Sequence, residues 1–150
     1  MEISILFLPL AASIIAGFFG RYIGDRNSEI ITSVLVSISA FLSIFVLYQV
    51  IINQYEENIV IATWINSGSL DVNWSMMIDP LSAVMLVVVT SVSSLVHIYS
   101  IGYMSHDPHK PRFMAYLSLF TFAMLMLVTS DNFIQLFFGW EGVGLCSYFL

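Results

Sequence analysis

Apolar residues occur along this chain in long blocks that are separated by short polar stretches. Five such blocks cover residues 3–19, 29–50, 80–103, 112–128 and 132–150. A helix of about twenty apolar residues is long enough to cross the ~30 Å hydrocarbon layer of a bilayer. The pattern therefore predicts an all-α, polytopic membrane protein with about five transmembrane helices.

Residues 59–76, between the second and third blocks, follow a different pattern. From Leu70 to Met76, apolar and polar residues alternate, which is the period of a β-strand. A polar loop at residues 66–69 separates this segment from another apolar stretch. The sequence predicts a small β-hairpin, which must lie outside the bilayer because hydrocarbon cannot satisfy its unpaired edges.

Polar residues and prolines mark the ends and interruptions of the predicted helices. Asp79 and Asp131 are expected to be N-caps, and Pro80 takes the first helical position after Asp79. Residues 20–28 predict a polar turn between the first two helices. Pro9 predicts a kink in the first helix, provided that a neighbouring helix satisfies the carbonyl group that this proline frees.

The composition excludes several classes of protein. Of the 150 residues, 59% are hydrophobic and only 9% are charged, which is too few charges to cover a soluble domain. The formal net charge of −6 argues against nucleic acid as a partner. Cys146 is the one cysteine, so it can form neither an internal disulfide nor a multi-cysteine metal site, and we expect it to be a small packing residue.

The basic residues predict how the chain is oriented in the membrane. All four of them, Arg21, Arg26, Lys110 and Arg112, lie in or beside the first and third connections. Short loops that carry lysine and arginine stay on the cytoplasmic side or its equivalent. We therefore expect the N-terminus and the hairpin on the opposite side.

The strongest candidate for a functional residue is Glu141, the one charged residue of the fifth block. It lies about nine residues into that helix, roughly 13 Å from its start and close to the midplane. A charge at that depth costs from a few to more than ten kcal/mol unless it finds a partner. Proton transfer is the functional interpretation, and a carboxylate that is only hydrogen-bonded within the bundle is the alternative. No lysine or arginine of this sequence lies at that depth, so a cationic partner must come from elsewhere.

His97 is the one histidine inside a predicted helix, and two interpretations of it stay open. It is either hydrogen-bonded to a neighbouring helix or an accessory proton-transfer residue, to which the ordinary histidine pKa near 6.5 is suited. His106, Asp107 and His109 resemble a metal cluster in composition. The two prolines of that segment favour a solvated loop instead, so no metal site is predicted.

Three glycines, Gly139, Gly142 and Gly144, surround Glu141. They are not a dinucleotide-binding fingerprint, because no strand precedes them. Gly142 and Cys146, four residues apart, predict a face of small residues that allows close helix packing.

Residues 139–148 (GWEGVGLCSY) resemble the hallmark of the ND5/NuoL subunit family of respiratory complex I, the NADH:quinone oxidoreductase. Residues 97–104 and 127–133 carry further similarity, and the likeness extends over the whole chain. Because the family is several times longer, residues 1–150 correspond to the N-terminal part of its antiporter-like transmembrane domain.

The resemblance implies a membrane-arm subunit that translocates protons through a buried glutamate while quinone is reduced elsewhere in the complex. Glu141 falls on the fifth-helix glutamate of the family, which pairs there with a lysine on a later helix. The resemblance also implies no cofactor in this chain, other membrane-arm subunits as partners, and a bacterial inner (plasma) or mitochondrial inner membrane. Two alternatives stay open: a subunit of a multisubunit cation/proton antiporter, and a non-transporting membrane scaffold.

Overall fold

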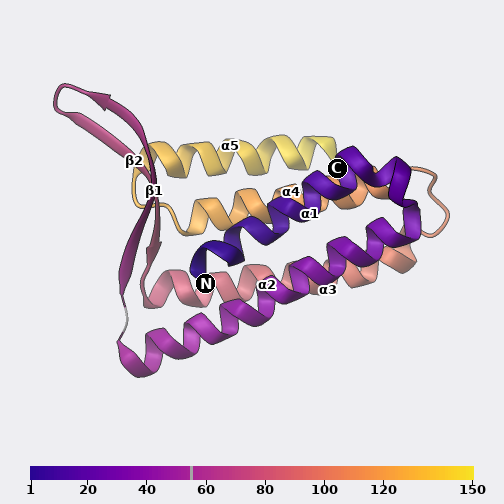
Figure 1. Ribbon diagram of the computed structural model, residues 1–150, viewed down its shortest axis with the longest axis horizontal. Helices are drawn as coiled ribbons and strands as arrows, with labels where there is room; N and C mark the ends of the chain where they lie inside the picture. Colours follow the sequence, from indigo (N-terminus) through magenta and orange to yellow (C-terminus); the bar gives the residue numbers. More distant parts are fainter. Residues whose placement is uncertain (55) are drawn as a thin grey trace.

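Five helices lie side by side, and a β-hairpin stands at one end of the bundle (Figure 1). The computed structural model describes residues 1–54 and 56–150. In chain order the elements are α1 (Glu2–Ile23), α2 (Asp25–Asn53), β1 (Glu57–Ser67), β2 (Leu70–Ile78), α3 (Pro80–Tyr103), α4 (Lys110–Val128) and α5 (Phe133–Phe149). The predicted helical fold with a hairpin between the second and third helices is confirmed.

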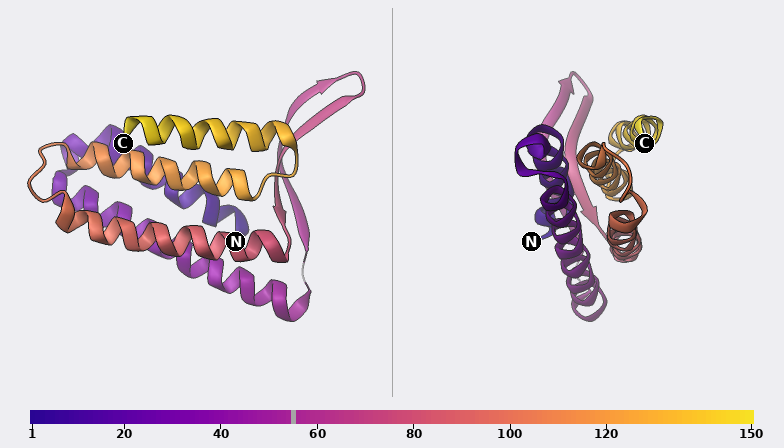
Figure 2. Two further views of the ribbon diagram at one scale, coloured as in Figure 1. Left: turned by 180° about the vertical axis from the view of Figure 1, so that it is seen from behind. Right: turned by 90° about the vertical axis from the view of Figure 1, so that its right-hand side faces the viewer.

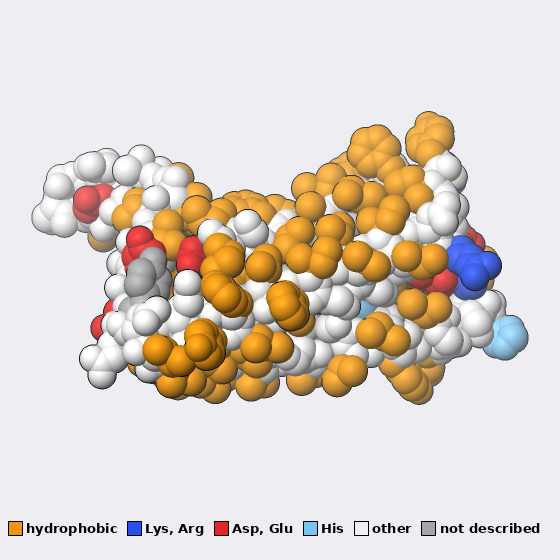
Figure 3. Space-filling view, turned by 60° about the horizontal axis from the view of Figure 1, so that its bottom comes forward, with side chains coloured by type: hydrophobic (Ala, Val, Ile, Leu, Met, Phe, Trp, Pro, Cys, Tyr) orange, Lys and Arg blue, Asp and Glu red, His pale blue; other side chains and the backbone are white. Residues whose placement is uncertain are grey.

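The outside of the bundle is apolar, as a membrane-spanning protein requires. Four helices, α1 to α4, are long and apolar enough to cross a membrane. With 17 residues, α5 is at the lower end of the length range for a span. Large apolar side chains point outward from these helices, among them Phe18 and Phe41, which are 78% and 74% exposed. Figure 3 shows such side chains over much of one face.

The inside of the bundle, in contrast, contains many serine and threonine side chains. Ser39, Ser43, Thr90 and Ser118 are completely buried. The hydroxyl groups of Ser43 and Thr90 lie 2.7 Å apart and join α2 to α3. Hydrogen bonds of this kind hold membrane helices together where the surrounding lipid provides no hydrophobic driving force.

Pro9 shows how closely the polar groups of this interior are matched. Proline has no N–H group, so the carbonyl oxygen of Ile5, four residues earlier, loses its helical partner. The Ser39 hydroxyl of α2 donates a hydrogen bond of 2.7 Å to that oxygen. A neighbouring helix therefore satisfies the carbonyl group that Pro9 frees, as expected, and α1 runs from Glu2 to Ile23 as one helix.

The connection between α1 and α2 is much shorter than the sequence predicted. The prediction of a polar turn over residues 20–28 is wrong, because both helices continue into that segment and Gly24 alone separates them. Gly24 has φ 86° and ψ 159°, a conformation that glycine adopts without strain. One glycine therefore reverses the chain direction and leaves the polar residues on the helix ends.

The hairpin is longer and its turn tighter than expected. Pairing begins at Glu57 with Ile78 and continues to Ser67 with Leu70, so the strands extend beyond residues 59–76. The predicted four-residue loop is reduced to two residues, Gly68 and Ser69. Gly68 has φ 61°, which allows the tight turn.

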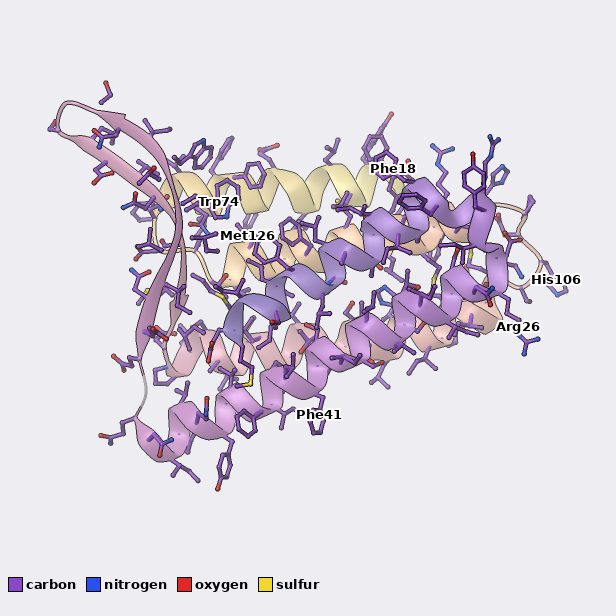
Figure 4. All side chains as sticks on the ribbon, in the orientation of Figure 1. Phe18, Arg26, Phe41, Trp74, His106 and Met126 are labelled. Atoms are coloured by element: carbon purple, nitrogen blue, oxygen red, sulfur yellow. The ribbon has the colours of Figure 1, made fainter. Side chains whose placement is uncertain are left out.

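Hydrogen bonds attach β2 to the start of α5. The buried Gln135 side chain accepts a bond from the Ser75 N–H at 3.0 Å and donates one to the Ser75 carbonyl at 2.7 Å. A ring cluster lies beside it, in which Trp74 is 5.0 Å from Trp64 and 4.8 Å from Phe138 between centroids. Figure 4 shows Trp74 where the hairpin meets α5. The hairpin thus fixes the position of α5.

One of the two predicted N-caps is right and the other is wrong. Asp79 caps α3, accepting a 2.6 Å bond from the Ser82 N–H, while the Ser82 hydroxyl accepts one from the Asp79 N–H. The bond from the Ser82 N–H holds the pKa of the Asp79 carboxyl below its ordinary value, so the cap loses its stabilising effect as the pH falls through the lowered value. Asn132, not Asp131, caps α5, because the Asp131 carboxylate accepts a bond from the Ser75 hydroxyl instead.

The two ends of the bundle differ in charge. The N-terminus and the hairpin lie toward one end, and the connections that carry the basic residues lie at the other (Figures 1 and 4). At the basic end, Lys110 Nζ is 3.9 Å from Oε1 of the buried Glu29, which ties α4 to α2. This arrangement agrees with the orientation predicted from the sequence.

The predicted orientation can be tested by cysteine labelling. In a Cys146→Ser background, Ser69→Cys on the hairpin and His109→Cys before α4 should react with an impermeant maleimide from opposite sides of the membrane, because they lie at opposite ends of the spans. Labelling of both positions from the same side would contradict the topology.

Removal of the Gln135 side chain should destabilise the hairpin end. Gln135→Ala leaves the buried N–H and carbonyl groups of Ser75 without partners, which costs about 1–3 kcal/mol for each group. We expect a lower midpoint of thermal unfolding, measured by circular dichroism in detergent. Asn58→Ala, which removes an exposed amide from β1, is the matched control and should leave the midpoint unchanged.

Candidate functional site

Glu141 lies at the middle of α5. It is eight positions after Phe133 at the start of the helix and eight positions before Phe149 at its end. At 1.5 Å per residue, each end is about 12 Å away along the axis. If α5 crosses the membrane, the carboxylate is therefore near the midplane, as the sequence predicted.

The opposite face of α5 is held against α4 by small residues. Gln135, Gly139 and Cys146 are buried, at the spacing of one helix face. A Cβ atom at Gly139 would lie 2.9 Å from the Leu127 backbone, and one at Gly142 would lie 3.2 Å from the Ala123 side chain. The predicted packing role of Gly142 and Cys146 is confirmed. Gly144 has open space beside it and plays no such role within the described residues.

The Glu141 side chain points away from this packed face and is exposed. The carboxylate is uncovered within these residues because α5 lies at the edge of the bundle and packs chiefly on α4 (Figure 2). Burial of Glu141 in the complete subunit stays a prediction. Within residues 1–54 and 56–150 the carboxylate has no hydrogen bond or ion pair. Its surroundings on this face are apolar: Phe137, Trp140, Leu145 and Tyr148 are all exposed.

No basic residue of the described chain lies near Glu141 along the helix axis. All four lysine and arginine residues are in the last turn of α1 or in the first turns of α2 and α4, at the basic end. Lys110 already has the Glu29 carboxylate as its partner. The sequence-based inference that a cationic partner must come from outside this chain agrees with this arrangement.

His97 is completely buried between α3 and α4. Its Nδ1 atom lies 2.7 Å from the Ser93 carbonyl oxygen, which can only accept, so Nδ1 carries the proton. Its Nε2 atom lies 3.0 Å from the Ser118 hydroxyl and is free to accept a bond from it. Both ring nitrogens thus have partners in the neutral imidazole. The hydrogen-bonded interpretation of His97 is supported.

Polar side chains that were not predicted from the sequence lie in a line beside His97. The Ser93 hydroxyl contacts Thr121 on α4, and the Ser37 and Ser94 hydroxyls, 2.8 Å apart, join α2 to α3. Spacings of three and four residues connect Thr90, Ser93, Ser94 and His97 along α3. This spacing of hydroxyl residues on one face of the helix is the sequence signal from which the polar line could have been predicted.

The structure does not bring Glu141 and His97 together. Helix α4 lies between α3, which carries His97, and α5, which carries Glu141 (Figure 2). In the loop before α4, the Asp107 carboxylate accepts a 2.7 Å bond from the His109 N–H and so stabilises a turn. The absence of a metal site there stays a prediction.

The sequence is similar to known proteins of one kind. Residues 64–114 match the profile described as NADH-Ubiquinone oxidoreductase (complex I), chain 5 N-terminus. All 150 residues align with NADH-ubiquinone oxidoreductase chain 5 of Arabidopsis thaliana at 57% identity. The alignment with this relative extends over the whole of the chain. The chain 5 proteins of Phytophthora infestans and Aspergillus niger are 54% and 49% identical over 99% and 100% of this chain.

The chain spans only about 22% of the length of the Arabidopsis and Phytophthora relatives and 23% of the Aspergillus relative. The resemblance to the N-terminal part of the ND5/NuoL family is thereby confirmed. The chain 5 relatives, together with four apolar helices, support the predicted location as a multi-pass protein of an inner membrane.

Loss of the His97 ring should weaken the contact between α3 and α4. In His97→Ala the Ser118 hydroxyl loses its partner and the Ser93 carbonyl keeps only its helical one, so we expect destabilisation of about 2–4 kcal/mol from the lost hydrogen bonds and the new cavity. Thermal unfolding in detergent measures this loss. His106→Ala, in the exposed loop of the same end, is the control. An unchanged unfolding midpoint in His97→Ala would contradict the structural role.

Proposed function

We propose that this chain is the N-terminal part of a membrane-arm subunit of complex I that translocates protons while quinone is reduced elsewhere in the complex. The observation that carries the proposal is the position of Glu141, at the midpoint of an apolar helix whose sequence matches chain 5. Its carboxylate has no partner among residues 1–54 and 56–150. As a subunit of NADH:quinone oxidoreductase, the chain would contribute proton movement and no redox cofactor of its own.

The physical basis of the proposal is the cost of a charge at that depth. An ionised carboxylate in hydrocarbon is strongly unfavourable, whereas a neighbouring cation or a proton removes most of the cost. A cation that approaches and leaves Glu141 would therefore alternate the carboxylate between its ionised and protonated forms. Such alternation loads and releases one proton in each cycle.

The exposed apolar face around Glu141 supports a partner from outside this chain. Four fifths of the length of the chain 5 relatives lies beyond the part that this chain matches. Helices from that part, or from another membrane-arm subunit, would cover the face and supply the cation. Contact with such a partner would turn an exposed carboxylate into a buried one.

His97 is proposed to be an accessory residue for proton transfer. Both of its ring nitrogens have hydrogen-bond partners, and α4 separates it from Glu141. Water and the hydroxyl groups of Ser93 and Ser118 can replace part of its role. The His97→Ala complex is therefore expected to pump more slowly rather than not at all.

Glu141→Gln is the decisive test of the proposal. Glutamine keeps the shape and much of the hydrogen bonding but cannot exchange a proton, so the assembled complex should pump at least about tenfold more slowly, equivalent to 1.4 kcal/mol in the rate-limiting barrier. Proton uptake by reconstituted vesicles and NADH:quinone activity are measured together. Glu141→Asp keeps the titrating group with a shorter reach and should retain part of the activity.

The control for this experiment is Asp71→Asn, which removes an exposed carboxylate from the hairpin and should pump normally. Wild-type pumping by an assembled Glu141→Gln complex would leave Glu141 a packing role, as in a non-transporting scaffold. Failure of the variant to assemble would be recognised from the subunit content of the purified complex, and Glu141→Asp would then carry the test.

A further inference from the structure

A cleft of about 710 Å³ opens between α1 and α4 at the basic end of the bundle. Its walls come from the last turns of α1, the start of α2, the loop before α4 and the first turns of α4. Two guanidinium groups, of Arg21 and Arg112, and one carboxylate, of Asp25, line it together with the His109 ring. The cleft therefore has a net positive lining.

The guanidinium of Arg112 is held in position at the edge of this cleft. Its Nε atom donates a 3.2 Å bond to the Tyr116 hydroxyl, and its Cζ atom lies 5.5 Å from the centre of the Tyr116 ring. This use of Nε leaves the two terminal amino groups for a ligand. Paired N–H groups of arginine match the oxygen atoms of a phosphate group.

Below the arginines, the cleft is walled by small residues. Ala16 and Gly17 of α1 face Ala115 of α4, and a Cβ atom at Gly17 would be 3.6 Å from the Ala115 Cβ. Ala16 lies five residues before Arg21, which places it about 7.5 Å deeper along the helix. The cleft thus extends from the membrane boundary, where both arginines lie, toward the hydrocarbon layer.

We propose that this cleft binds the phosphate of an anionic phospholipid, with Arg21 and Arg112 on the phosphate and the glycerol beside the exposed Gly17. Three observations favour a lipid over a soluble anion. The arginines are in the terminal turns of apolar helices, at the depth of lipid headgroups. The cleft continues along α1 from Arg21 as far as Ala16, and Phe18 on the same stretch is exposed, as expected of a lipid-facing surface.

The third observation is the side of the membrane. The basic residues predict that this end faces the cytoplasm or its equivalent, where anionic lipids attract lysine and arginine. Basic pockets between transmembrane helices on that side bind anionic headgroups. The cleft contains neither Glu141 nor His97, so lipid binding there can be tested independently of the proposed proton transfer.

The experiment uses the full-length subunit in its assembled complex, in nanodiscs that contain either phosphatidylglycerol or phosphatidylcholine with a photoreactive group near the glycerol. After illumination, lipid-modified peptides are mapped by mass spectrometry. We expect phosphatidylglycerol to modify peptides that contain residues 16–20 and 111–116, and phosphatidylcholine to modify them much less. In the double variant Arg21→Gln/Arg112→Gln, this modification should fall about tenfold.

Arg26→Gln is the matched control, because Arg26 lies at the same end of the bundle but does not line the cleft (Figure 4). It should leave the modification unchanged. Equal modification by both lipids, or full modification of the double variant, would overturn the proposal. Displacement of the lipid by an excess of inorganic phosphate would assign the cleft to a soluble anion and would overturn the lipid assignment.

Discussion

The need to satisfy polar groups inside a membrane is the constraint on which this structure depends. Lipid offers no hydrogen bonds, so each polar group that the helices bury requires a partner from the protein. The Ser39 hydroxyl therefore lies at the carbonyl that Pro9 frees, and Gln135 satisfies both backbone groups of Ser75. His97 meets the same requirement between α3 and α4, with one partner for each ring nitrogen.

These pairings divide the bundle into two ends with different properties. At the hairpin end, side-chain amides and aromatic rings attach β2 to α5 and so fix where α5 begins. At the basic end, the Glu29–Lys110 ion pair joins α2 to α4, and Arg21 and Arg112 line an open cleft. The first end determines the position of the carboxylate helix, while the second presents positive charge to the membrane boundary.

Glu141 has no such partner within the described residues. The small residues of α5 allow it to pack closely on α4, and this packing turns the carboxylate toward the uncovered face of the helix. A carboxylate at this depth without a partner costs several kcal/mol, and the cost falls when a cation covers the face. Because this face of α5 is uncovered within this chain, a partner that binds to it would change the relative stability of the ionised and protonated forms of Glu141.

The sequence by itself determined the five apolar helices, the hairpin and the position of Glu141 along α5, because length, alternation and charge act locally. It also determined the small-residue face of Gly142 and Cys146. It did not determine the one-residue connection at Gly24, the capping of α5 by Asn132, or the burial of Gln135. Those depend on which elements become neighbours: Asp131 is drawn to Ser75 on a strand far away in sequence, and the exposure of Glu141 follows from the side of α5 that α4 occupies.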